Sequence, residues 1–381
     1  MAGVLMLLAA ALGFIAMNTG LKSWYDMIRE PVLTISFGSA SVGKPILFWL
    51  NQGAMTMVLF LVGLECKRAF LDGELVGPDR LRLPLAAALG GMMASAAACA
   101  GMNWTDPAPR AWWVIPMGMD LALGLAVLSW LGERVPGALK AFFATTAMFA
   151  LLGTVIVLAG MQAGLLSGPV LGLAGACLAT LFLMNLARVE AISVYLIPAL
   201  VLWVAVAESG AHAALAGLLP AFFIPARNRE QTRSPLAQLE QDLLIAVCCV
   251  ALPLLTLANA GLLIEAAGAA MMEPRTLGIL LGLFPAKALG LLGLCWIGVR
   301  IRVCALPPGL GWKEICGVAL LGGAGFTVNF FLGTAVAGGS GADLDGVCLA
   351  AMAGSAISLP GGYFFLRHVL ARRRNKVLQR S

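Results

Sequence analysis

The sequence predicts an all-α polytopic membrane protein with about twelve transmembrane helices. Hydrophobic residues make up 60% of the 381 residues, charged residues make up 12%, and the mean hydropathy is +0.93. Soluble domains average about 45 to 50% hydrophobic and about 25% charged residues. If successive connectors lie on alternate sides of the membrane, most of the 25 Lys and Arg fall on one side, as the positive-inside rule expects for the cytoplasm. This balance excludes a soluble fold, and the net charge of +6 does not indicate a nucleic-acid partner.

Each predicted span is an apolar run bounded by charged, glycine or proline residues, and one transmembrane domain is expected over residues 1–381. The first run has no basic leader, so we interpret it as a retained helix with the N-terminus in the cytoplasm. The predicted spans are Met1–Met17, Pro45–Leu64, Leu83–Met102, Ala111–Leu131, Gly137–Ala159, Gly168–Ala187, Ile192–Ala207, Ala211–Ile224, Leu243–Leu263, Leu277–Val299, Ile315–Gly338 and Val347–Leu366.

Two polar segments lie outside these spans. Residues 18–44 form an outer segment in which Leu33–Phe37 alternates as an exposed hairpin strand would, and such a strand can pair with another subunit. Residues 368–381 form a basic cytoplasmic tail. The nine cysteines contain no CxxC pair and lie mostly in apolar runs, which favours small hydrophobic residues over disulfides or metal ligands.

Two spans are predicted to be broken. Asp120 lies inside an apolar run, where insertion of a charged residue costs roughly 2.5 to 3.5 kcal/mol, so an intramembrane carboxylate indicates a functional site. Pro116 and Gly118 precede it, and the cluster Gly322–Thr327 interrupts the eleventh span. Irregular backbone at membrane depth survives where protein covers it, and two such breaks are typical of inverted repeats with crossed half-helices.

One interpretation of Asp120 and Lys287, the two charged residues predicted within the membrane, is charge compensation. Asp120 would offset the positive N-terminal ends of the half-helices, and Lys287 the negative C-terminal ends. The alternative for Asp120 is a proton or ion site. Both readings stay open at this stage.

Six motifs in the same order resemble the NhaA family of sodium/proton antiporters, from the first span to Arg367. They are Val62–Arg68, Gly132–Lys140, Ser209–Gly217, Phe222–Pro225, Leu257–Gly261 and Gly323–Thr327. The resemblance implies a secondary active transporter of the bacterial inner membrane that exchanges monovalent cations for protons in pH and sodium homeostasis. It also implies a homodimer joined through the outer hairpin. The distribution of the basic residues predicts a multi-pass protein with both termini cytoplasmic, and no cofactor is predicted.

The resemblance carries roles over to single residues. Asp120 matches the family's ion- and proton-binding aspartate, and Lys287 its intramembrane lysine, which serves charge compensation or proton coupling. Glu65 and His212 match positions linked to the pH response. Gly323, Gly325 and Thr327 match the backbone of the second broken helix.

Four positions depart from the family pattern, and one of them is Ala69, where the family has an acidic residue after the Glu65 motif. Where the family places an adjacent pair of sodium-binding aspartates in the fifth span, this chain has Ala150 and Leu151, and Met119 replaces a threonine before Asp120. Sodium is a hard cation that needs several oxygen ligands. Sodium binding at Asp120 is therefore in question, and a non-transporting or altered-substrate homologue with a regulatory or structural role is the alternative function.

Several of these polar residues also have a purely structural interpretation. Lys287 would find Asp120, backbone carbonyls or water as its partner, or lose its proton. Glu65 would pair with Lys67 or Arg68. His212 is expected at a turn, as a capping or solvated histidine. Thr146 and Thr154, on the same helix face as Ala150, would bond back to their own helix. The apolar runs hold no GxSxG or HExxH motif, so an intramembrane enzyme has no support.

Overall fold

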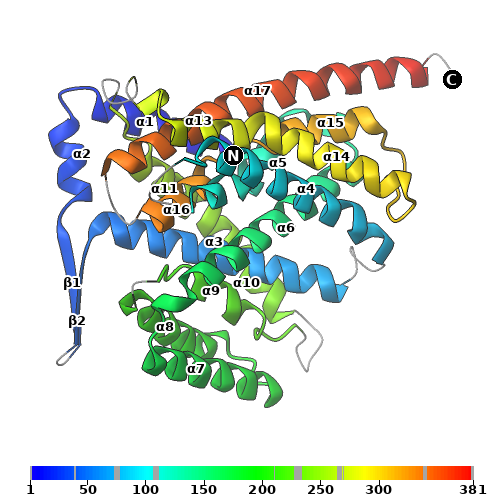
Figure 1. Ribbon diagram of the computed structural model, residues 1–381. Helices are drawn as coiled ribbons and strands as arrows, with labels where there is room; N and C mark the ends of the chain where they lie inside the picture. The colour runs from blue at the N-terminus through cyan, green and yellow to red at the C-terminus, as the bar shows by residue number, and fades with distance from the viewer. Residues whose placement is uncertain are drawn as a thin grey trace. The chain divides into compact units, whose positions relative to one another are not determined.

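The computed structural model describes residues 2–37, 40–72, 78–105, 111–209, 211–226, 234–263, 268, 270–337 and 341–378. Within these residues the secondary structure is helical except for one two-stranded sheet (Figure 1). The chain divides into two compact units, each assembled from distant segments of the sequence. The prediction of one domain over residues 1–381 is not decided by this division and stays a prediction.

The first unit comprises residues 1–4, 77–156 and 262–381. Its helices are α4 (Pro78–Met102), η1 (Trp112–Met117), α5 (Leu121–Trp130), η2 (Gly132–Arg134), most of α6 (Gly137–Gln162), α13 (Pro274–Leu281), η5 (Gly282–Ala286), α14 (Lys287–Arg300), α15 (Trp312–Leu321), α16 (Phe326–Ala337) and α17 (Gly341–Leu378). Of these, η1 and η2 are 3₁₀-helices and η5 is a π-helix.

The second unit comprises residues 5–76 and 157–261. It contains most of α1 (Ala2–Met17), α2 (Lys22–Arg29), β1 (Val32–Phe37), β2 (Ala40–Pro45), α3 (Ile46–Asp72), η3 (Ala163–Leu165), α7 (Gly168–Leu186), α8 (Ile192–Glu208), α9 (Leu215–Ala221), α10 (Pro235–Ala246), η4 (Val247–Ala251) and α11 (Leu252–Asn259).

The helices confirm an all-α polytopic membrane protein. Among the described residues, eight helices are long and apolar enough to cross a membrane, and the bent pair α15 and α16 adds a ninth. Two shorter apolar helices, Gly3–Met17 and Ile192–Glu208, together with α9, fall on the remaining predicted spans. Large apolar side chains such as Ile156, Leu186 and Leu289 are exposed on these helices, as lipid contact requires.

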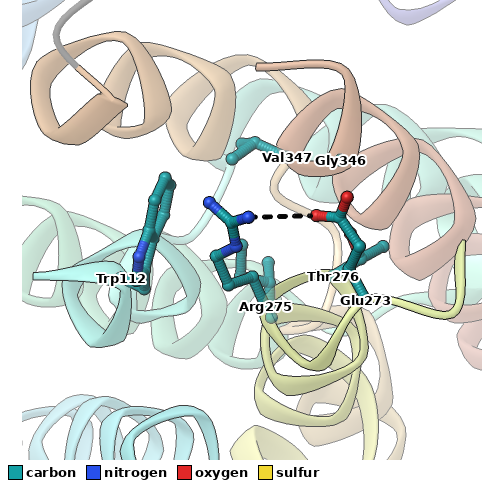
Figure 2. Close-up of a pocket in the computed structure, with 7 residues that line it drawn as sticks. Trp112, Glu273, Arg275, Thr276, Gly346 and Val347 are labelled. Atoms are coloured by element: carbon teal, nitrogen blue, oxygen red, sulfur yellow. Dashed lines mark ion pairs between the residues drawn. The ribbon is translucent and has the colours of Figure 1, made fainter. Parts of the chain in front are cut away.

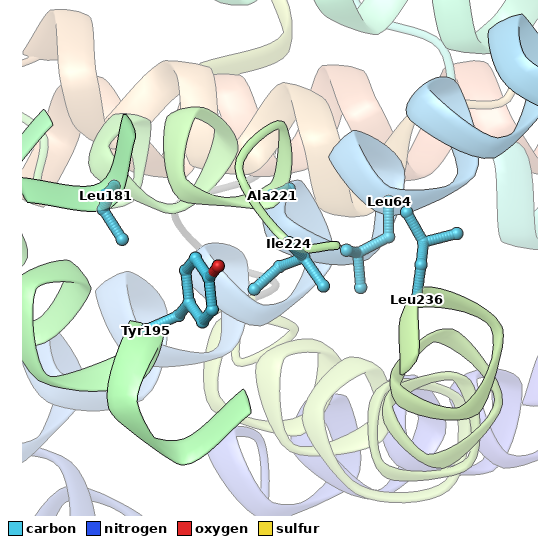
Figure 3. Close-up of a cluster of buried hydrophobic side chains, with 6 residues drawn as sticks. All are labelled: Leu64, Leu181, Tyr195, Ala221, Ile224 and Leu236. Atoms are coloured by element: carbon cyan, nitrogen blue, oxygen red, sulfur yellow. The ribbon is translucent and has the colours of Figure 1, made fainter. Parts of the chain in front are cut away.

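A buried apolar cluster holds the second unit together. Leu64, Leu181, Tyr195, Ala221, Ile224 and Leu236 come from five different helices or their ends and converge in Figure 3. The Tyr195 hydroxyl donates to the Val189 carbonyl at 3.0 Å, so its polar end is satisfied. Gly63 allows α3 to lie against α9, because a Cβ there would lie 2.6 Å from the Ala221 Cβ.

A β-hairpin is present in the predicted segment, together with a helix that was not predicted. Strands β1 and β2 pair antiparallel, with Leu33 opposite Lys44. The polar residues before them form the amphipathic helix α2, which the sequence reading did not predict. The Tyr25 hydroxyl of α2 donates to the Leu257 carbonyl at 2.6 Å, so a long-range contact supports this eight-residue helix.

Three predicted boundaries are wrong. The eighth span, predicted over Ala211–Ile224, contains only the seven-residue helix α9. The ninth begins earlier, at Pro235, where Ser234 caps α10 by accepting the Ala237 N–H and proline suits the first helical position. Helix α17 continues to Leu378, so most of the basic tail is helical, because arginine and lysine are good helix formers.

Helices α4 and α14 approach closely through a pair of glycines. A Cβ built at Gly90 would lie 2.2 Å from the Gly290 carbonyl oxygen, and one at Gly290 would lie 2.2 Å from the Gly90 carbonyl oxygen. Small residues allow this approach in membranes, where packing replaces the hydrophobic driving force. Gly293, on the same helix, faces open space.

Gly290→Ala is expected to destabilise the protein by about 1 to 3 kcal/mol, because the new methyl overlaps backbone that cannot move aside. Gly293→Ala is the matched control and should leave the melting temperature unchanged or slightly higher, since alanine favours helix. Thermal unfolding in detergent measures both. Equal melting temperatures for the two variants would contradict the close packing of α4 on α14.

Candidate functional site

The predicted break at Asp120 is present in the first unit. Helix η1 ends at Met117, the backbone is extended at Gly118 and at Asp120, and α5 begins at Leu121. Asp120 is the N-cap of α5, and its Oδ1 accepts the backbone N–H of Ala122 at 3.1 Å and of Leu123 at 3.2 Å. The residue is 2% exposed. A buried carboxylate thus meets the positive end of a helix dipole.

The second break lies between α15 and α16, which bend by 48°. The four residues 322–325 separate the two helices, within the predicted glycine cluster. The Gly325 N–H donates to the Ser355 Oγ of α17 at 3.2 Å. A Cβ at Gly323 would lie 2.2 Å from the Ser358 Oγ, so only glycine admits α17 this closely.

The two breaks contact each other directly. The Asp120 N–H donates to the Ala324 carbonyl at 3.0 Å, and the Thr327 hydroxyl donates to the Asp120 Oδ2. The backbone N–H of Thr327 also bonds to this carboxylate. Asp120 therefore caps the first turns of both α5 and α16. The fold brings together three groups that the sequence singled out, namely Asp120, the Gly323–Gly325 backbone and Thr327.

Lys287 approaches the same crossing from another helix. It follows the π-turn η5, which contains Pro285, and its Nζ donates to the Gly118 carbonyl. The side chain is 2% exposed. Lys287 and Asp120 form no ion pair. Of the partners predicted for Lys287 from the sequence, the one found in the structure is a backbone carbonyl. Gly118 follows the C-terminal end of η1, where a cation compensates the helix dipole.

The altered positions are buried and apolar. Ala150 and Leu151 of α6 are 4% and 3% exposed, and Met119 is 1% exposed. The Thr154 hydroxyl donates to the Ala150 carbonyl at 2.6 Å, which confirms the bond back to its own helix. The Thr146 hydroxyl is buried without a hydrogen-bond partner, so the same expectation is wrong there. Helix α6 contains no carboxylate.

Glu65 and His212 belong to the second unit. The expected partners of Glu65 are engaged elsewhere, because Arg68 pairs with Glu240 at 2.7 Å and Lys67 donates to the carbonyls of Phe222 and Ile224. Among the described residues, neither forms an ion pair with Glu65. Glu65 therefore makes no direct ion pair with either residue, although the Arg68 charge still acts on its carboxylate.

His212 lies between α8 and α9, where a turn was expected. Its backbone N–H donates to the Gln162 Oε1 at 2.8 Å. Burial lowers the pKa of the imidazole from 6.5 to about 4. The neutral form is therefore the one present in the folded protein near pH 7.

Three polar residues of the first unit were not predicted as site residues from the sequence. Ser355 accepts the Gly325 N–H, and Asn329 and Ser358 are fully buried. Both amide atoms of Asn329 and the Ser358 Oγ lack a hydrogen-bond partner. The available signal was a serine pair at i, i+3 in the twelfth span and an asparagine in the apolar eleventh.

A small pocket lies where η1 begins. Figure 2 shows Arg275 between Trp112 and Glu273. The guanidinium lies 5.5 Å from the Trp112 ring centroid and pairs with Glu273 at 3.6 Å. The charges in this pocket are mutually compensated, so it does not present a free carboxylate to a cation.

Two broken helices that meet at a buried carboxylate, among apolar spans, define a polytopic membrane protein with the discontinuous helices found in secondary transporters. The solved structure of the sodium proton antiporter MjNhaP1 from Methanocaldococcus jannaschii at pH 8 matches with a TM-score of 0.53 at 14% identity, covering 97% of this chain and 89% of that one.

The chain belongs to the family described as Na+/H+ antiporter 1, whose model matches residues 1–366. Among similar proteins, "Na(+)/H(+) antiporter NhaA 1" of Pseudomonas putida is 42% identical over 87% of this chain and 84% of its own length. "Na(+)/H(+) antiporter NhaA 1" of Syntrophotalea carbinolica is 39% identical over 97% and 94%. The resemblance seen in the motifs is confirmed, and the protein is a multi-pass member of a transporter family.

Thr327→Val should lower stability by about 1 to 3 kcal/mol, because the buried carboxylate of Asp120 loses a hydroxyl donor. Thr154→Val is the matched control, since that hydroxyl bonds only to its own helix carbonyl. Melting temperatures in detergent compare the two. A loss as large in Thr154→Val would contradict a special contribution from the Thr327–Asp120 bond.

Acid should destabilise the protein through His212. Between pH 6.5 and about 4 the unfolded chain binds a proton at His212 and the folded protein does not, so stability is lost as the pH falls through this range. His212→Gln should flatten the fall in melting temperature between pH 7 and pH 5. His368→Gln, at the exposed second histidine, should retain the wild-type profile. Identical profiles for His212→Gln and the wild type would refute this assignment.

Proposed function

We propose that this protein exchanges a monovalent cation for protons across the bacterial inner membrane, with Asp120 as the ion and proton site. The observation that carries the proposal is the buried Asp120 carboxylate at the contact of two broken helices. Unpaired carboxylates at membrane depth are costly, and discontinuous helices create ion sites in transporters. Family membership and the names of the relatives agree with this activity.

The proposed cycle uses one carboxylate. Asp120 alternately holds a proton and a cation, so one proton leaves for each cation that binds. Lys287 compensates negative charge at the crossing or couples to proton release, through its contact with Gly118. Because α6 has Ala150 and Leu151 where the resemblance implies an aspartate pair, we expect weak sodium binding and a changed stoichiometry.

Assembly and regulation complete the proposal. Among the described residues, β1 and β2 pair only with each other, so their outer edges could pair with a second copy, which supports a homodimer through residues 18–44. The distribution of basic residues supports a cytoplasmic position for both termini. We assign the pH response to Glu65 and, only well below neutral pH, to His212, whose pKa of about 4 keeps it neutral near pH 7. The exchange would serve pH homeostasis without a cofactor.

Proton flux in everted membrane vesicles tests the activity. Addition of lithium, sodium or potassium to acidified vesicles should release protons for at least one cation, and Asp120→Asn should abolish the release. Asp120→Asn keeps the side-chain size and one acceptor oxygen, so immunodetection of the variant in membranes serves as the expression control. Wild-type vesicles that release no protons with any cation would favour the alternative, a non-transporting homologue.

Restoring the missing carboxylates provides a gain-of-function test. Ala150→Asp with Leu151→Asp should increase sodium-dependent proton flux at least tenfold, because carboxylates supply most of the attraction for a dehydrated cation. The pair Ala150→Asn with Leu151→Asn is the uncharged control. Strong sodium exchange by the unmodified protein would show that the altered positions do not limit binding.

A further inference from the structure

The break between α15 and α16 is lined by polar atoms that bind nothing within the protein. Asn329 and Ser358 are both fully buried, and the Asn329 amide oxygen, the Asn329 amide nitrogen and the Ser358 Oγ all lack partners. Buried polar groups are nearly always hydrogen-bonded, so each exception needs a reason. The free-energy cost of an unsatisfied polar group is larger in the low-dielectric interior of a membrane protein.

These atoms face the backbone of both breaks. A Cβ at Gly118 would lie 3.2 Å from the Asn329 Oδ1, and one at Gly325 would lie 2.1 Å from its Nδ2. The Ser358 Oγ stands against Gly323, two residues earlier in the same break. Glycine at all three positions leaves the backbone open to these side chains. The unpartnered atoms therefore gather where the broken helices meet.

Asp120 alone cannot surround a cation. Its carboxylate already accepts the N–H groups of Ala122 and Leu123 and both the hydroxyl and the N–H of Thr327. A carboxylate offers about four lone-pair positions, so these bonds occupy its capacity. Any cation drawn to Asp120 must recover further oxygens from elsewhere, and α6 has no carboxylate to give.

We propose that the Asn329 Oδ1 and the Ser358 Oγ are neutral ligands of the transported monovalent cation. This inference rests on the proposed function and names the groups that replace the missing charged ligands. Neutral amide and hydroxyl oxygens replace hydration water as the oxygens of channel filters do, without adding charge to the buried site. The ligand class is a small monovalent cation that sheds part of its water.

Stability gives the first readout. In cation-poor buffer, Asn329→Leu should raise the melting temperature or leave it unchanged, because it removes two unsatisfied polar atoms. Asn51→Leu is the matched control, since Asn51 and Asn259 bond each other through both amides and the change orphans Asn259. That control should melt at a lower temperature. Ser358→Ala, a smaller change, serves the same purpose should Asn329→Leu fail to fold.

Cation binding gives the second readout. Sodium and lithium chloride should raise the melting temperature of the wild type relative to choline chloride, and Asn329→Leu and Ser358→Ala should lose this rise. In everted vesicles the apparent KM for the cation should increase about tenfold in either variant, while proton release at saturating cation persists. The apparent KM of Asn329→Ser should lie between that of Asn329→Leu and that of the wild type.

The outcomes separate the two proposals. Unchanged cation-induced melting and unchanged KM in both variants would overturn the ligand role, while the proposed exchange at Asp120 stands. Loss of proton release at every cation concentration, with the cation-induced rise retained, would assign the two residues to a water chain instead. Wild-type vesicles without flux would remove the proposed exchange, and the melting experiment would then decide cation binding by itself.

Discussion

The first unit depends on one carboxylate that caps two helices. Asp120 accepts N–H groups from the first turns of α5 and α16, and its own N–H donates to the Ala324 carbonyl of the second break. Without water at membrane depth, each free N–H would cost several kcal/mol. Because the same side chain serves both helices, the two interruptions of the chain stabilise each other.

Under the proposed function, this arrangement would couple cation binding at Asp120 to the positions of the two helices that it caps. A cation that takes an oxygen of Asp120 must compete with Thr327 or with the start of α5. Protonation has the same effect, since a neutral carboxyl is a weaker acceptor for the N–H groups. The Lys287 contact with Gly118 ties a third helix to this balance. Local changes of charge would thus bias the packing of α5, α16 and α14.

The sequence was sufficient to locate this site but not to arrange its contacts. A carboxylate in an apolar run and a glycine cluster are both anomalies, so Asp120 and the second break were predicted. The partner of Lys287 depended on which carbonyl the fold brings near, and no local pattern encodes that. Asn329 and Ser358 were missed because a polar residue in a helix usually bonds its own backbone. The helix α2 was missed because its support comes from Leu257, more than two hundred residues away.

The π-turn before Lys287 fixes the rotational phase of that lysine. A π-turn holds one residue more than the α-helical turn it replaces, and Pro285, which has no N–H, lies within it. In a regular α-helix each residue advances the side-chain direction by about 100°. Deletion of one residue from Gly282–Ala286 would therefore keep the span apolar and helical while turning the ammonium about a quarter turn or more from Gly118. A protein with this one-residue deletion would insert into the membrane equally well and would lack the lysine contact.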